Sequence, residues 1–490
     1  RGATLKYGGE SIDVRSAGRE LGARYVMEGS LRQAGQRLRL AVQLVDATSG
    51  AHLWAENYER TFTADTVFEF QDELVPRIVS TVADMHGVLP HRMSEALRHR
   101  APDELSSYES VLRSFGYYER MSAEEHAITR AALESAVRKA PGNADAWALL
   151  SMMYAEEFKQ GFNAKPDPLD RALEMARRAV TAAPSNHLAY HALATALYFR
   201  GQIPEFRNAA ERAVALNPMD GSTIAFMGIL LAYTGDWERG CALAERAMGL
   251  NPNFPGWFRF ADFYNAYRKA DYREALDVAR KLNLPTYYYT HAAIAAACGQ
   301  LGDREAARQA LRELLAQRPD FAASAREEYR KWLGDSELLE QILDGLRKAG
   351  LGVATADGAD AQAPEPSKAS APTEATARGD DGFWIAVLPF THGGTDPGIA
   401  ALADGLSEGI VTGMSRFSYL RVVSRGATLR YGGTATDARS AGRELGARYV
   451  MEGSVRQAGN KVRIAVQLVD ANSGANLWAE TYDRSFDPAA

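Results

Sequence analysis

The amino-acid sequence predicts a mostly helical protein, in which an α-helical solenoid is flanked by small α/β domains, and three observations predict this fold class. Prolines at positions 184, 218, 252, 285 and 319 recur with a nearly constant period. The stretch RYVMEGSLRQAG at 24–35 returns as RYVMEGSVRQAG at 448–459. The segment 352–382 contains no aromatic residue and is rich in Ala, Pro and Gly. A fixed period of this length is typical of stacked repeats, and the last composition is typical of a disordered linker.

Composition sets the limits of the interpretation. The chain has 490 residues, of which 46% are hydrophobic and 24% charged, an ordinary balance for a soluble protein of two to four domains. A net charge of -6 gives no general attraction to nucleic acid or to anionic membranes. The longest apolar run, 224–233, is about half of a membrane span. Two cysteines permit no disulfide framework, so we expect a cytoplasmic setting, although the sequence does not begin with Met and an upstream signal or anchor stays open.

The proline period marks pairs of helices. Each proline closes a segment such as AERAVALNP, and small residues recur where two helices must touch, at Ala194 and Gly228 in first helices and at Ala213 and Ala247 in second helices. Gly-Asp pairs at 235–236 and 302–303 are typical of the turns between them. Large apolar residues follow the spacing of amphipathic helices. The pattern predicts a stack of helical hairpins.

These residues resemble the tetratricopeptide (TPR) family. We count about six repeats within 105–320 and a capping segment to Leu351, so that 105–351 would form one solenoid. Phe206 stands where the family usually has alanine, and the repeat that ends at Pro285 is one residue short. The resemblance implies a superhelix whose first helices line a concave face.

The flanking segments are two unequal copies of one domain. Positions 1–62 align with 425–486 without a gap, and 47 of the 62 positions agree. The second copy, within 383–490, has a preceding strand and helix (384–417) that the first copy, within 1–90, lacks. Only the first copy is followed by a helical segment, at 67–88. We therefore expect the segment 1–62 either to pack poorly or to exchange elements with the other copy, within a chain or between chains.

The second copy contains the sequence motifs IAVLPF, ADGLSEGIVTGMSRF, RELGARYVMEGSVR and LVDANSGANLWAE. It is similar to the small α/β domain family named for the N-terminal domain of TolB. In that family the domain commonly precedes TPR repeats, and the pair follows an effector, such as a class III adenylate or guanylate cyclase, a CadC-type winged-helix regulator or a kinase. The resemblance implies a role in signal transduction.

The sequence offers no convincing catalytic or metal site. Ser407 lies in a G-x-S-x-G match but inside a helical stretch, whereas a nucleophile needs a sharp strand-to-helix turn. His187 and His191 stand at i and i+4 without an intervening Glu. We expect a non-enzymatic interaction scaffold that needs no cofactor and no metal. The alternative is the regulatory portion of a signalling enzyme, foremost a class III adenylate cyclase, whose catalytic domain lies outside this chain.

A peptide-binding groove is the candidate site. Phe199, Tyr233 and Tyr267 recur with the proline period, at one position of successive first helices. A second position gives His191 and Arg259, and Phe263 follows one turn after Arg259. We expect an exposed aromatic row with a basic or switchable edge that binds a protein or peptide partner, and neither nucleic acid nor membrane. The alternative is that these rings only pack between adjacent repeats.

Overall fold

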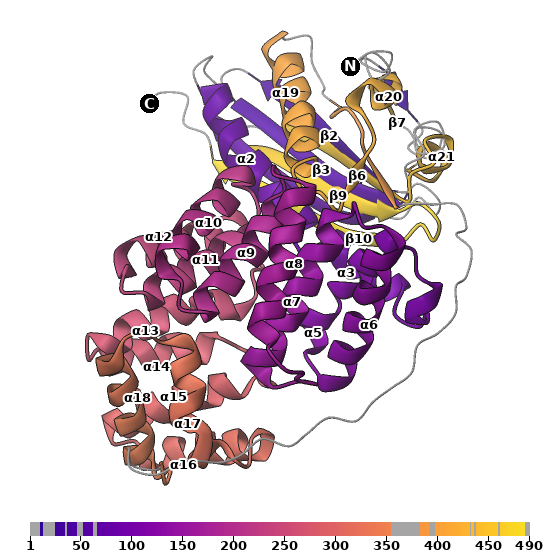
Figure 1. Cartoon of the computed structure of the whole chain (residues 1–490). Coiled ribbons are helices and arrows are strands. Elements are labelled where there is room, and N and C mark those ends of the chain that lie inside the picture. Colours follow the sequence, from indigo (N-terminus) through magenta and orange to yellow (C-terminus); the bar gives the residue numbers. More distant parts are fainter. Residues whose placement is uncertain are drawn as a thin grey trace. The chain divides into compact units, whose positions relative to one another are not determined.

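The computed structural model describes residues 10–12, 25–34, 37–46, 52–61, 66–353, 383–391, 397–431, 433–435, 438–458 and 461–485. The chain divides into two compact units, shown in Figure 1. The α/β unit comprises Arg1–Glu119 and Gly379–Ala490, and the repeat unit comprises Arg120–Arg378. Most of the predicted linker, from residue 354 to 382, lies outside the described residues.

The repeat unit is a stack of antiparallel helix pairs, as the proline period predicts (Figure 1). Its helices are α6 (Ala123–Lys139), α7 (Ala144–Gln160), α8 (Pro168–Ala182), α9 (His187–Phe199), α10 (Ile203–Leu216), α11 (Gly221–Tyr233), α12 (Trp237–Leu250), α13 (Phe260–Arg268), α14 (Tyr272–Lys281), α15 (Tyr288–Leu301), α16 (Arg304–Gln317), α17 (Phe321–Trp332) and α18 (Ser336–Ala349). Consecutive helices from α7 to α16 pack as pairs, and α18 packs on α15. The helical solenoid is confirmed.

Local signals fix where these helices begin and end. Asn143, Asn186 and Asp220 each accept a hydrogen bond from the backbone N–H at the third position of the following helix turn, at 3.1, 3.0 and 2.9 Å. Such caps satisfy backbone donors that a helix leaves without a partner at its first turn. The predicted Gly-Asp turns are also present, because Gly235, two residues after the end of α11, and Gly302, directly after α15, adopt positive φ angles of 95° and 73°.

Close backbone contact holds α11 against α12. A Cβ atom placed on Gly228 would lie 2.7 Å from the carbonyl oxygen of Gly240, and one on Gly240 would lie 2.5 Å from that of Gly228. The predicted helix contact at Gly228 is therefore confirmed. Ala194, Ala213 and Ala247 are fully buried.

The α/β unit contains the same three-stranded antiparallel meander twice. Its strands are β2 (Tyr25–Ala34), β3 (Arg37–Asp46) and β4 (His52–Thr61) in one copy, and β8 (Tyr449–Ala458), β9 (Lys461–Asp470) and β10 (Asn476–Ser485) in the other. Tyr25 pairs with Asp46, and the equivalent Tyr449 pairs with Asp470, so the first hairpins share one register. Two short strands, β5 (Trp384–Val387) and β6 (Arg421–Val422), continue the sheet, and β1 (Glu10–Ile12) pairs separately with β7 (Gly433–Ala435).

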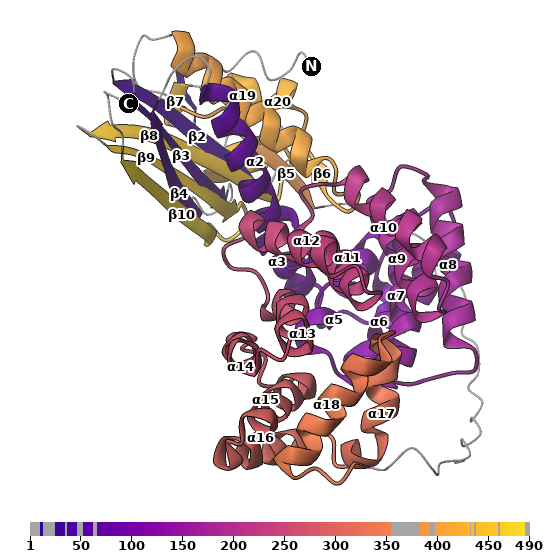
Figure 2. The ribbon, with the colours of Figure 1, turned by 90° about the vertical axis from the view of Figure 1, so that its left-hand side faces the viewer.

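Helices of both copies pack together in this unit. In Figure 2, α2 (Thr66–Ala83), which only the first copy has, lies beside α19 (Pro397–Met414), which only the second copy has. The Tyr419 hydroxyl donates a 2.9 Å hydrogen bond to the Ala83 carbonyl, and a Cβ atom on Gly409 would lie 2.9 Å from Val75. The two segments predicted as separate α/β domains thus belong to one compact unit.

The helix α4 (Ser107–Ser114) also belongs to the α/β unit, although the sequence assigns it to the solenoid. The Tyr108 hydroxyl lies 3.4 Å from the carbonyl oxygens of both Phe383 and Tyr419, and the Phe115 ring packs 4.7 Å from the Tyr419 ring. The two hydrogen bonds of Tyr108 join residues 275 and 311 positions apart, so helical periodicity alone does not reveal them. No helix in the described ranges has both the length and the apolarity needed to cross a membrane.

Candidate functional site

The structure buries most of the predicted groove residues. Tyr267 is 0% exposed and Tyr233 4%, and Phe199, His191 and Phe263 are also buried, whereas Arg259 is half-buried with its guanidinium 4.7 Å from the centre of the Phe254 ring. The expected exposed row of rings is therefore not found. The buried side chains pack inside the repeat unit, though not only between adjacent repeats as the alternative had it, because Phe199 contacts Trp332 of α17. Their binding of a partner stays a prediction.

The three rings of the row meet different neighbours. Phe199 packs edge-on against Trp332 of α17, with 5.1 Å between the ring centres. Tyr233 packs edge-on against Tyr264 at 5.2 Å. The Tyr267 hydroxyl donates to the carbonyl oxygen of Gln341 in α18 at 3.2 Å. The chain that follows the last repeat thus covers both ends of the row.

The helix α17 is held by first helices from both early and late repeats. The Tyr198 hydroxyl of α9 donates a hydrogen bond to the carbonyl oxygen of Trp332, although the two residues are 134 positions apart. The Trp332 indole N–H donates to the Tyr289 hydroxyl of α15 at 3.1 Å. Lys331 places its ammonium 5.9 Å from the centre of the Phe158 ring of α7. We call the surface that receives this helix the α17 cradle, and it comprises Phe158, Lys159, Tyr198, Phe199, Tyr288 and Tyr289.

A buried carboxylate of α17 anchors this helix in the cradle. Glu328 is 5% exposed and accepts hydrogen bonds from the hydroxyls of Tyr288 at 3.1 Å and Tyr289 at 3.3 Å. Its other oxygen accepts from Arg318 at 3.1 Å and Lys331 at 2.9 Å. Burial raises the pKa of the Tyr289 hydroxyl well above its usual range, so this hydroxyl stays protonated and remains a donor. A carboxylate removed from water needs such partners to offset the loss of hydration.

The Lys159 ammonium of the cradle lies among aromatic rings of α9, α11 and α17. The Lys159 ammonium is 5.8 Å from the centre of the Phe199 ring, 5.3 Å from that of Phe226 and 5.7 Å from that of Trp332, and it also pairs with Glu156. An ammonium at this distance from aromatic faces is attracted by their quadrupoles. The cradle therefore combines apolar area, hydroxyl donors and a positive charge.

Sequence reasoning missed this site. The sequence pattern identifies the segment Glu327–Trp332 (EEYRKW) only as part of a capping helix, although it places an acid, a tyrosine and a tryptophan on a short helix after the last proline. Aromatic residues in a capping segment are the available signal. Periodicity identifies the lining helices but not the helix that they bind.

The surroundings of His191 correct the prediction that this residue forms a switchable edge of the groove. Its Nδ1 lies 2.9 Å from the Thr223 hydroxyl, and its ring stacks on Phe226. Burial lowers the pKa of His191 to about 4, and the nearby Asp220 carboxylate only partly offsets that effect. The imidazole is therefore neutral at physiological pH. His187 pairs instead with Asp220, its Nε2 3.0 Å from a carboxylate oxygen.

This depressed pKa predicts how stability depends on pH. Between pH 6.5 and about 4 the unfolded chain binds a proton at His191 that the folded chain does not, so unfolding becomes easier as pH falls. The slope attributable to this residue approaches about 1.4 kcal/mol per pH unit. Denaturant titrations from pH 7 to 4 on the wild type and on His191→Gln check this, because the variant should lose that part of the slope. An NMR titration in which the His191 ring protonates near pH 6.5 would contradict it.

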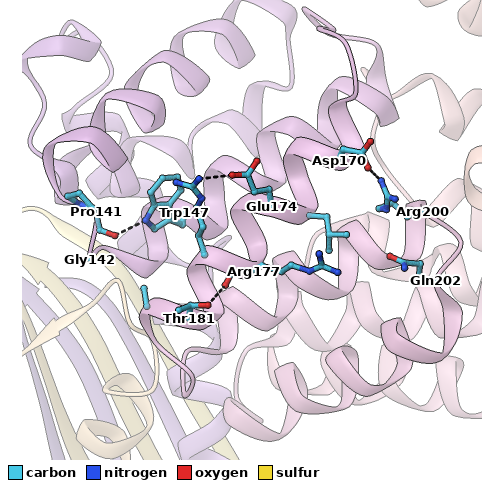
Figure 3. Close-up of a pocket in the computed structure, with 12 residues that line it drawn as sticks. Pro141, Gly142, Trp147, Asp170, Glu174, Arg177, Thr181, Arg200 and Gln202 are labelled. Atoms are coloured by element: carbon cyan, nitrogen blue, oxygen red, sulfur yellow. Dashed lines mark hydrogen bonds and ion pairs between the residues drawn. The ribbon is translucent and has the colours of Figure 1, made fainter.

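The repeat unit also contains an open hollow (Figure 3). It has a volume of about 810 Å³ and lies between α7, α8 and the turn that precedes α10. Its charges are largely paired with one another, since Arg200 pairs with Asp170, and Arg178 pairs with Glu174 at 2.6 Å while its guanidinium lies 5.0 Å from the centre of the Trp147 ring.

The structure also describes the Ser407 motif and the residues that could bind a metal. Ser407 lies inside α19, where its hydroxyl accepts from the Phe390 amide at 3.0 Å and donates to the Ala403 carbonyl at 2.9 Å. It is therefore not on a nucleophile elbow. Over the described residues, no three His, Cys, Asp or Glu side chains gather as a metal site would require.

Two sequence comparisons match parts of the chain. Residues 381–487 match the family model of the HilA/YgeH-like transcriptional regulator, second domain. A stretch of 103 residues is 48% identical to "Putative adenylate cyclase 3" of Rhizobium meliloti (strain 1021), and it covers 21% of this chain and 18% of that protein. The chain thus matches less than one fifth of that relative's length.

Several solved structures resemble the repeat unit at low identity. Pseudomonas aeruginosa PilF is 16% identical, covers 49% of this chain and 97% of its own, and gives a TM-score of 0.32. YrrB, described as a TPR protein with an unusual peptide-binding site, is 18% identical and covers 38% of this chain and 93% of its own, with a TM-score of 0.26. A thermophilic TPR protein of Thermus thermophilus is 18% identical and covers 39% of this chain and 98% of its own, with a TM-score of 0.32. These similarities give no information about function.

Proposed function

We propose that this chain is a non-enzymatic interaction scaffold whose repeat unit binds a segment of a partner protein in the α17 cradle. The observation that carries the proposal is the occupancy of the cradle by α17, a helix far in sequence from α7 and α9. A surface that holds one amphipathic helix through rings, hydroxyls and a cation has the chemistry to hold another. In this proposal the partner contacts Phe199, the ring of the predicted row that packs on Trp332.

The chemistry of α17 specifies the partner. A competing helix needs an indole or comparable ring at the place of Trp332, because that ring contacts both Phe199 and Tyr289. It also needs a carboxylate at the place of Glu328 to receive the two tyrosine hydroxyls. Buried aromatic anchors of this kind usually dominate binding energy. Because α17 is tethered to the cradle, its displacement lowers the partner's apparent affinity.

A synthetic peptide with the sequence of positions 319–334 tests the cradle directly. In the Trp332→Ala chain the tethered helix loses its ring contacts, so the added peptide should bind this variant at least about tenfold more tightly than the wild type. Fluorescence anisotropy of the labelled peptide measures the two dissociation constants. A peptide carrying the same Trp-to-Ala change is the matched control and should not bind. Equal affinity for both chains would exclude a displaceable site, provided that circular dichroism shows the variant to be folded.

We also propose that 383–490 is a TolB N-terminal-like domain, that 1–90 is its truncated copy, and that 105–351, apart from the helix α4, are TPR repeats with their cap. The signature words of the sequence support the first assignment, and the proline period with its capped helix pairs supports the last. Self-association through the two copies is a further property that we propose. A cytoplasmic location fits the two unpaired cysteines.

The alternative is that the chain is the regulatory portion of a class III adenylate cyclase. The 48% identity to "Putative adenylate cyclase 3" favours it, although the match spans only 18% of that protein. Sequencing the gene beyond both ends of the present sequence separates the hypotheses. A cyclase catalytic domain in the same reading frame would favour the regulatory role, and its absence from the complete gene would favour the scaffold.

A further inference from the structure

The hollow between α7, α8 and the turn before α10 has an apolar part in its lining. Its volume of about 810 Å³ lies in the range of small-molecule sites. Leu173 and Trp147 line it, and both are nearly buried. The Trp147 indole N–H donates to the Pro141 carbonyl at 2.8 Å, which holds the ring in place. An apolar group of a ligand can therefore pack against these two side chains.

The charged residues that line the hollow do not balance. Three arginines stand against two acids, which gives the lining a net charge of +1: Arg177, Arg178, Arg200, Asp170 and Glu174. Arg178 pairs with Glu174 at 2.6 Å, and Arg200 pairs with Asp170. Arg177 is exposed and forms no ion pair with any residue in the described part of the chain. In Figure 3 its side chain points toward Arg200. The surplus positive charge of the hollow therefore lies at Arg177.

The repeat period shows that Arg177 departs from the pattern of its neighbours. The segment ARRAV at 176–180 corresponds to AERAV at 210–214, so the equivalent of Arg177 in the next repeat is Glu211. Glu211 pairs with Arg239 at 2.8 Å. One repeat before Arg239 stands Glu205, so Arg177 and Glu205 are the same two positions with reversed charges. They form no ion pair in the structure. The guanidinium of Arg177 is therefore available to a ligand.

We propose that this hollow binds a small organic acid that has one carboxylate and an apolar body. The carboxylate binds to Arg177 and Arg200, because a planar guanidinium can donate two parallel hydrogen bonds to a carboxylate. The apolar body packs against Leu173 and Trp147. A single negative charge matches the net charge of the lining. A doubly charged phosphate monoester would bring a second negative charge close to the acids of the hollow, and like charges repel.

Titration of the full chain with phenylacetate, followed by NMR at the tryptophan indole N–H groups, tests the proposal. A ligand of this size is expected to bind with a dissociation constant in the millimolar range. Arg177→Gln should raise this constant at least about tenfold, because it removes a charge-assisted hydrogen bond. Arg207→Gln changes an exposed arginine of α10 that does not line the hollow. This matched control should leave the constant within about twofold of the wild type.

Related probes separate the charge from the apolar contact. Phenylacetamide lacks the charge and acetate lacks the ring, so each should bind at least about tenfold more weakly than phenylacetate. Phenyl phosphate, at a pH where it carries two charges, should also bind more weakly. If the amide binds as tightly as the acid, or if Arg177→Gln binds phenylacetate as tightly as the wild type does, the proposal is wrong.

The same NMR signals locate the probe. The Trp147 indole signal, assigned with Trp147→Phe, should shift during the titration, and the Trp332 signal of α17 should not. A shift of the Trp332 signal without one of Trp147 would place phenylacetate in the α17 cradle and overturn the proposal. No residue of the cradle lines the hollow, so the result does not depend on whether the cradle binds a partner.

Discussion

Replacement of Tyr267 by alanine is expected to lower the free energy of unfolding of the repeat unit by about 3–5 kcal/mol, the usual cost of emptying a buried aromatic site. Tyr267 is 0% exposed, and its ring lies 5.7 Å from Phe263 and 5.0 Å from Tyr272. Its hydroxyl joins α13 to α18 through the Gln341 carbonyl. Denaturant unfolding followed by circular dichroism measures the loss.

Tyr267→Phe is the matched control for the ring itself. It keeps the buried ring and removes only the hydroxyl, so it should cost about 1 kcal/mol. The result also bears on the groove hypothesis, under which the double change of Tyr233 and Tyr267 to alanine would leave the melting temperature nearly unchanged. A loss below about 1 kcal/mol in Tyr267→Ala would show that the ring is not a packing residue.

Two glycine-to-alanine changes in α12 are expected to have opposite signs. At Gly240 the added Cβ would lie 2.5 Å from the Gly228 carbonyl and 2.6 Å from the Ala232 amide, so α11 and α12 must separate. Overpacking of this kind typically costs about 1–3 kcal/mol. At Gly249, near the end of the same helix, no atom lies within 4 Å of the added Cβ. Alanine there should stabilise by up to about 1 kcal/mol, because it reduces the conformational freedom of the unfolded chain.

Both variants replace a glycine of the same helix by alanine, so each serves as a control for the other. Thermal unfolding of both variants beside the wild type provides the measurement. If Gly240→Ala were neutral, the close approach of α11 and α12 would not be needed for stability. If Gly249→Ala were as destabilising as Gly240→Ala, helix-end effects rather than packing would account for the results.

Sequence by itself determined the helical repeats, because their signals act over a few residues. Asn186 and Asp220 cap the helices that they precede, Gly235 and Gly302 turn the chain at positive φ, and Gly228 permits the contact between α11 and α12. The duplication was equally visible, since an alignment of the chain with itself needs no spatial information.

Only the tertiary structure decided what covers the repeats and what completes the sheet. The repeat period places Phe199 and Tyr233 on one side of their helices, but it does not show whether water or another segment lies against that side. Trp332 reaches Phe199 from a distant part of the sequence, and β5 and β6, which lie far from β2–β4 in the sequence, continue the sheet. Burial depends on such long-range contacts, which form only when the chain folds. The hydrophobic pattern of a single helix or strand is the same whether its partner is present or absent, so that pattern does not reveal the contacts.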